Sequence, residues 1–118
     1  MPDAVVIERL NRAFGRIKSY ERIGLGDETL RELDALPLAV RELPSNQLRR
    51  GRVLERLERF AEAIKIYDQM EPSTLSQLGR VRCLSHLGRR AEAARFLDKI
   101  PFDPAVVREF VEARDSLR

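Results

Sequence analysis

An internal repeat constrains this chain more than any other feature of its sequence. Shifted by 30 positions, residues 59–63 (RFAEA) align with residues 89–93 (RRAEA). Further identical pairs in the same register are Gln47/Gln77, Leu48/Leu78, Arg50/Arg80, Arg52/Arg82, Leu54/Leu84, Leu57/Leu87 and Asp68/Asp98. A period of this length is typical of repeat proteins, in which each unit buries its apolar face against the next unit. We therefore expect two equivalent units stacked side by side.

Each repeat carries the pattern of two helices joined by a short turn. In the first repeat, Ser45 is a candidate N-cap of the first helix, and Pro72 ends the second helix. In the second repeat, Gly88 stands at the turn, where a left-handed backbone favours glycine. The pattern predicts helical hairpins over residues 45–71 and 73–100.

The segments that flank the repeats are also expected to be helical. Upstream, apolar residues with helical spacing predict a longer and less regular hairpin over 3–43, with a kink or split at Pro37. Downstream, Asp103 precedes a proline, which is a strong start signal for a closing helix over 104–117. The predicted fold is all-α: three stacked antiparallel helical hairpins plus a C-terminal capping helix, in one domain that spans all 118 residues.

Small and turn residues recur at fixed places in the two units. Gly51 lies in a first helix, Glu58 and Gly88 lie at the turns, and Ala63 and Ala93 follow five residues later. The pairs Ile66-Tyr67 and Phe96-Leu97 and a closing proline complete the pattern. Over about residues 44–104 this pattern resembles the tetratricopeptide repeat (TPR), although the period is 30 rather than about 34 residues. The resemblance implies a TPR-like α-solenoid.

A narrower resemblance concerns the order of elements. Three TPR-like hairpins, a compressed repeat and a final helix are found in the needle-subunit chaperones of bacterial type III secretion systems. Segments 50–87 and 103–117 are similar to that group, whereas residues 1–40 match it poorly. The resemblance implies a chaperone that shields an apolar helix of a needle-type subunit from premature assembly.

The TPR resemblance also implies a binding surface, because the first helix of each unit lines a concave wall in that family. The wall residues here are Ser45, Leu48, Arg52, Glu55, Arg56, Leu75, Leu78, Arg82, Ser85 and His86. Their spacing places them on one face of each helix. Leucines can hold an apolar anchor, and guanidinium groups can bind a carboxylate. We therefore expect a protein partner that offers a peptide or an amphipathic helix with apolar and acidic groups.

Two other functions are compatible with the sequence. One is a self-associating helical scaffold, because a stack of hairpins has open ends and the irregular first hairpin offers one of them. The other is a nucleic-acid accessory module, since arginines cluster between Arg49 and Arg59. Glu55, Glu58 and Glu62 are interleaved with these arginines. A salt-bridged helix surface is therefore the favoured interpretation, and nucleic acid is not expected as a partner.

No arrangement of side chains predicts catalysis, a metal site or a cofactor. Cys83 and His86 share a helix face, but the sequence holds no further Cys or His to complete a zinc site. The position of Cys83 in the repeat corresponds to Val53, which predicts a small core residue. Ser85 and His86 are adjacent, so a helix points them apart and prevents a nucleophile–base pair.

Glu62 and Glu92 also occupy matched positions in the two repeats and could be taken for a catalytic carboxylate pair. Lys65 and Arg95 follow them three residues later, which predicts an exposed ion pair on each helix instead. The expected protein is a binding module and not an enzyme.

Composition adds expectations about the setting. A single cysteine cannot form an internal disulfide, which favours a reducing compartment. The 22 Lys+Arg against 19 Asp+Glu give a formal net charge of +3, without a polybasic tail. No apolar run approaches the ~20 residues of a membrane-spanning helix, and the N-terminus lacks the order of a secretory signal. We expect a cytoplasmic protein without a membrane partner.

Overall fold

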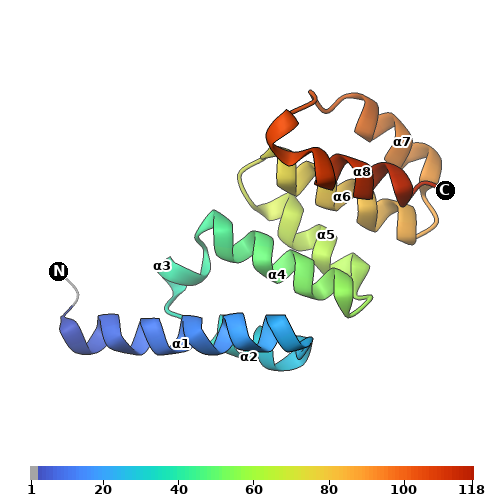
Figure 1. Ribbon diagram of the computed structural model, residues 1–118. Helices are drawn as coiled ribbons and strands as arrows, with labels where there is room; N and C mark the ends of the chain where they lie inside the picture. The colour runs from blue at the N-terminus through green and yellow to red at the C-terminus, as the bar shows by residue number, and fades with distance from the viewer. Residues whose placement is uncertain (1–2) are drawn as a thin grey trace.

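The computed structural model describes residues 3–118 as helices and their connections (Figure 1). The helices are α1 (Ala4–Ile23), α2 (Gly26–Asp34), α3 (Leu38–Arg41), α4 (Pro44–Arg56), α5 (Phe60–Gln69), α6 (Thr74–His86), α7 (Arg90–Asp98) and α8 (Val107–Asp115), with a 3-10 turn, η1 (Pro104–Val106), before α8. No strand occurs within the described range, so the predicted all-α class is confirmed. No helix in this range is long and apolar enough to cross a membrane.

The helices pack as consecutive pairs. α1 packs on α2, α4 on α5 and α6 on α7, while α2–α4 and α5–α6 contacts join one pair to the next. Two starts differ from the expected ones: α4 already begins at Pro44, and the closing helix is α-helical only from Val107, after η1. The molecule measures 49 × 27 × 23 Å, with α1 and α2 at one end and α7 and α8 at the other (Figure 1).

The sequence repeat is also a repeat of backbone conformation. The turns after α4 and α6 contain Glu58 at φ 59° and Gly88 at φ 84°, both left-handed. In each turn the N–H of the next residue donates to a carbonyl five residues earlier, Arg59 to Leu54 and Arg89 to Leu84, both at 2.9 Å. These hydrogen bonds close the last turn of each first helix. Glutamate adopts this backbone at a cost of about 1 kcal/mol, which glycine avoids.

Helix starts follow local rules, with one correction. Ser73 caps α6, and it forms a capping box with Ser76. Ser45 is not an N-cap, because α4 begins one residue earlier at Pro44 and Leu43 occupies the cap position. The fixed φ of proline suits the first position of a helix, which explains the earlier start. The predicted interruption at Pro37 is present, between the end of α2 and the start of α3.

Three apolar clusters form the core, centred on α1 and α2, on α4 and α5, and on α6 and α7. The middle cluster also takes in Leu30 of α2 and Cys83 of α6, and the last takes in Ala113 of α8. Ala63 and Ala93, which are equivalent in the repeat, are both fully buried. Cys83 is buried too, as its correspondence with Val53 predicted. Ala113 of α8 follows Cys83 by the same interval that separates Cys83 from Val53, and it is also fully buried. At this position α8 corresponds to the first helix of a unit, although Arg108 and Arg114 stand where the units have the buried Leu78 and Leu84.

Candidate functional site

The residues predicted to form a binding wall lie on α4 and α6, and their exposure differs strongly. Leu78 and Ser85 are buried, and only 6% of Arg82 is exposed. Leu48, Arg52 and Glu55 are half-buried, whereas Arg56 and His86 are exposed. Burial of the central residues leaves little of this wall for a partner.

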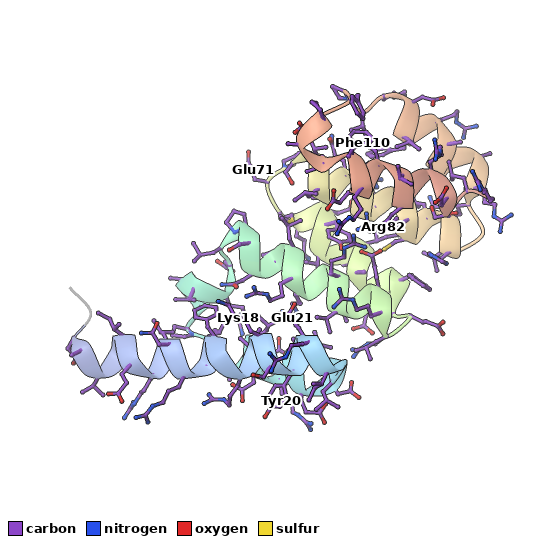
Figure 2. The ribbon with its side chains drawn as sticks, in the orientation of Figure 1. Lys18, Tyr20, Glu21, Glu71, Arg82 and Phe110 are labelled. Carbon is purple, nitrogen blue, oxygen red and sulfur yellow. The ribbon has the colours of Figure 1, made fainter. Side chains whose placement is uncertain are left out.

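Glu55 is the centre of a buried polar network. Its carboxylate accepts hydrogen bonds from Nε and Nη2 of Arg82 at 2.8 and 3.0 Å, and from the Tyr67 hydroxyl at 2.5 Å. Figure 2 shows Arg82 where α4, α6 and α8 converge. Burial acts to lower the pKa of Arg82, but the hydrogen bonds to Glu55 and the negative charge of Glu55, with smaller contributions from Tyr67 and Glu112, together raise it. The net shift is upward, so the guanidinium stays charged. Burial, with Glu55 nearby, raises the pKa of the Tyr67 phenol.

Two glycines allow this network to form. The ring of Tyr67 lies between α4 and α6, against Gly51 on one side and Gly79 on the other. A Cβ at either glycine would lie 2.5 Å from atoms of the ring. Any larger residue would therefore push α4 or α6 away from α5. The TPR resemblance had singled out Gly51 and Tyr67, whereas the part played by Gly79 was missed.

Helix α8 forms hydrogen bonds with two further polar residues of the wall, Arg52 and Ser85. Nη2 of Arg52 donates to Glu112 at 2.6 Å, and the hydroxyl of Ser85 donates to the carbonyl of Ser116. The hydrogen bond from Arg52 lowers the pKa of the Glu112 carboxyl. Arg52 and Arg82 were predicted to bind a partner's carboxylate, but the chain itself supplies those carboxylates, from Glu112 and Glu55.

The arginine cluster that begins at Arg49 is salt-bridged, mostly to partners in other helices. Arg49 pairs with Glu21 of α1 at 2.8 Å, and Arg50 pairs with Asp34 of α2 at 2.9 Å. Figure 2 shows Glu21 on the side of α1 that faces α4. These pairs attach the first hairpin to α4, so the cluster presents less free positive charge than its sequence suggests.

The predicted ion pairs of the two matched glutamates are wrong in direction. Glu62 pairs with Arg59, and Glu92 pairs with Arg89, each three residues before the glutamate. Lys65 and Arg95 were expected instead. Arg59 and Arg89 directly precede their helices, at the turn, so each carboxylate lies in the first helical turn, where negative charge is favoured.

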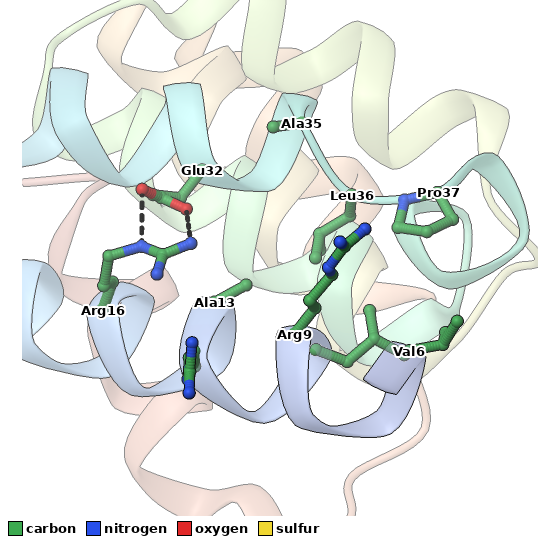
Figure 3. A pocket seen from close by; sticks show the side chains of 10 residues that line it. Val6, Arg9, Ala13, Arg16, Glu32, Ala35, Leu36 and Pro37 are labelled. Carbon is green, nitrogen blue, oxygen red and sulfur yellow. Dashed lines mark hydrogen bonds and ion pairs between the residues drawn. The ribbon is translucent and has the colours of Figure 1, made fainter. Parts of the chain in front are cut away.

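An apolar groove lies away from the predicted wall, at the N-terminal end of the chain. A groove of about 520 Å³ separates α1 from the end of α2 and the start of α3 (Figure 3). We call it the N-terminal groove; its lining residues are Val6, Arg9, Leu10, Arg12, Ala13, Arg16, Glu32, Ala35, Leu36 and Pro37. It is open because α1 has 20 residues and α2 only nine, so the first turns of α1 extend past α2.

Apolar side chains extend the N-terminal groove to the surface. Val5, Val6 and Ile7 are all exposed at the start of α1. One helix face cannot bury three consecutive apolar residues, because successive side chains point about 100° apart. This run was the signal in the sequence that the first helix has a second apolar side, and the sequence-based prediction did not use it.

The rim of the N-terminal groove is basic. Arg16 donates two hydrogen bonds to Glu32, at 2.8 and 3.0 Å (Figure 3), which raise the pKa of its guanidinium. Arg12 pairs with Glu8, one turn earlier on α1. Within residues 3–118, no ion pair engages Arg9. An apolar floor beside arginines is complementary to an amphipathic helix with acidic flanks.

The two remaining candidate residues, Cys83 and His86, do not form a common site. Burial raises the pKa of the Cys83 thiol to about 12, so it is not a thiolate at neutral pH. His86 is exposed and stacks on Phe60, with ring centroids 4.5 Å apart. Over the described part of the chain, no cluster of His, Cys, Asp and Glu could hold a metal ion.

Comparisons with protein-family models, with curated proteins and with solved structures find no match to this chain.

Proposed function

We propose that this chain is a non-catalytic protein-binding module of TPR-like architecture that holds an amphipathic helix of a partner protein in its N-terminal groove. The observation that carries the proposal is the combination of an apolar floor with three arginines, Arg9, Arg12 and Arg16, along the rim. The floor is suited to the apolar face of a helix. The arginines favour glutamate or aspartate on its flanks.

A rigid scaffold supports this function. The network around Glu55 ties α4, α5 and α6 together, and Arg49 and Arg50 join α4 to the first hairpin. Across the groove itself, the two hydrogen bonds from Arg16 to Glu32 join α1 to α2. A groove held in this way loses little conformational entropy on binding. The partner's segment bears most of the ordering cost, which suits a module that captures a flexible segment.

The resemblance to needle-subunit chaperones extends the proposal to a class of partner. In that case the partner is a needle-type subunit, and the module shields its apolar helix from premature assembly. Co-expression of the chain with a needle-type subunit from the same genome tests this extension. A soluble complex supports it; a subunit that still aggregates in the presence of the chain contradicts it.

Binding to the groove is tested with two synthetic helices of about 15 residues, since shorter ones are marginal helices in water. Both carry leucine along one face; one is flanked by glutamate and the other by lysine. We expect the glutamate helix to bind about tenfold more tightly, ~1.4 kcal/mol, in calorimetric titration. Its advantage should shrink as salt is added, because the arginines are exposed.

Variants then locate the site. Val6→Asp places a charge on the apolar floor, near the start of α1, where an aspartate is compatible with the helix. We expect it to abolish binding of the glutamate helix without changing the circular dichroism spectrum. Val107→Asp is the matched control, because Val107 is an exposed valine at the start of α8. Equal binding by Val6→Asp and the parent chain would contradict the assignment.

A further inference from the structure

A second apolar groove lies between α7 and α8. These helices are at the opposite end of the molecule from α1 and α2 (Figure 1). It also measures about 520 Å³; we call it the C-terminal groove, and its lining residues are Ala94, Leu97, Asp98, Ile100, Phe102, Val107, Phe110, Val111, Arg114 and Leu117. Phe102 is 64% exposed beside it and packs on Phe110, with ring centroids 5.1 Å apart. Val107 and Val111 are also exposed, so apolar groups both line the groove and project around it.

The repeat register explains why this groove is open. One period after the two glycines that contact Tyr67, the sequence has Val81 and Glu109, and one period after Tyr67 itself it has Leu97. The last unit therefore lacks the small residues that let α4, α5 and α6 approach closely. α8 packs mainly on α6 and has little contact with α7. In the middle of the chain, one side of α5 is covered by α6. The equivalent side of α7 is not covered by α8.

Charge distinguishes the two grooves. Among the described residues that line the C-terminal groove, one is acidic, Asp98, and one is basic, Arg114. In a two-fold dimer each patch contacts a copy of itself, so a balanced rim can pair Asp98 of one copy with Arg114 of the other. In the N-terminal groove, Arg12 and Arg16 are paired with Glu8 and Glu32, and no ion pair within residues 3–118 engages Arg9. The groove therefore keeps a positive excess, which a copy of itself would repel.

We propose that a second copy of this chain covers the C-terminal groove in a two-fold dimer, with Phe102 of each copy inserted beside Phe110 of the other. This assigns self-association to the last helices and not to the irregular first hairpin. It leaves the N-terminal groove of each copy free, and it does not depend on what that groove binds.

Sedimentation equilibrium of the full chain over a range of concentrations tests the dimer. We expect the apparent mass to rise from that of one chain to that of two. Phe102→Asp should keep the mass at one chain throughout, since it places a charge in the interface. Ile23→Asp is the matched control, because Ile23 is equally exposed, at 64%, but lies at the end of α1; its mass should rise as in the parent chain.

A charge exchange tests the arrangement itself. Asp98→Arg alone, or Arg114→Asp alone, should weaken the dimer at least tenfold, and the double exchange should restore most of the affinity. Val107→Asp provides a second apolar test, with a side chain that favours the start of a helix. A parent chain that stays monomeric overturns the proposal. So does a dimer that survives both Phe102→Asp and Val107→Asp, or one that is lost equally in Ile23→Asp.

Discussion

The contact between α5 and α6 and the contact between α7 and α8 stand at equivalent places in the repeat, yet one is closed and the other is open. We call them the middle seam and the last seam. In the middle seam, Gly51 and Gly79 admit the ring of Tyr67, and Glu55 with Arg82 completes the contact. The last seam has larger residues at the glycine positions and leaves an apolar groove.

The difference between the two seams shows that the repeated units can keep the same fold while the contacts between them differ in how tightly they close. Both units retain the turn, the buried alanine and the hydrogen bonds that close the first helix. Those features fix the hairpin. The distance to the next helix depends instead on a few side chains between helices, because close-packed interiors do not tolerate an extra group. A closed seam contributes stability, and an open seam offers a surface.

The largest expected change in stability follows from removing the buried charge of Arg82 in the middle seam. Arg82→Met leaves the Glu55 carboxylate buried without its cation, and we expect a loss of about 3–5 kcal/mol in the free energy of unfolding. Urea denaturation followed by circular dichroism measures it. Arg90→Met, at an exposed arginine of α7, should change stability by less than about 0.5 kcal/mol. Comparable losses in the two variants would show that the ion pair does not hold the seam.

An intermediate effect is expected from closing the space at Gly79. Gly79→Ala should cost about 1–3 kcal/mol, because the new Cβ meets the Tyr67 ring. Gly15→Ala in α1 is the control, since no atom lies within 4 Å of its added Cβ. There, better helix propensity should stabilise the protein by about 0.5–1 kcal/mol. If thermal denaturation shows Gly79→Ala to be stabilising as well, the tight packing of the middle seam is refuted.

The smallest effect concerns the ion pair from Arg52 to Glu112, which attaches α8 to the wall. The pKa of Glu112 is lower in the folded protein than in the unfolded chain, so its contribution is present above the ordinary pKa of glutamate. That contribution disappears as the pH falls through the lower, folded pKa. Glu112→Gln should therefore cost less than about 1 kcal/mol at neutral pH, since the pair is partly exposed.

The measurement for Glu112→Gln is a series of urea titrations from neutral to acidic pH. The difference from the parent chain should narrow as the pH falls and vanish in strong acid. A difference that stays constant with pH would mean that the substitution acts through packing and not through charge.

Much of the fold was predictable because its signals are local. Helical spacing, the proline at position 37 and the turn residues indicated the all-α class and the division into helices. The site was less predictable. Arg52 and Arg82 were correctly placed on neighbouring helices, but their use inside the molecule was not foreseen. Glu112 lies on a different helix, far along the chain from Arg52, and no sequence pattern links the two side chains.

The sequence alone determined the repeat, the positions of its helices and turns, and the small residues buried within each hairpin, because these depend on neighbours along the chain. Only the tertiary structure decided which charged side chains are paired within the molecule and which apolar surfaces remain exposed. Those outcomes depend on how closely one helix approaches another and how far α1 extends past α2. Such distances result from all the contacts between helices together, so they cannot be predicted from a local sequence pattern.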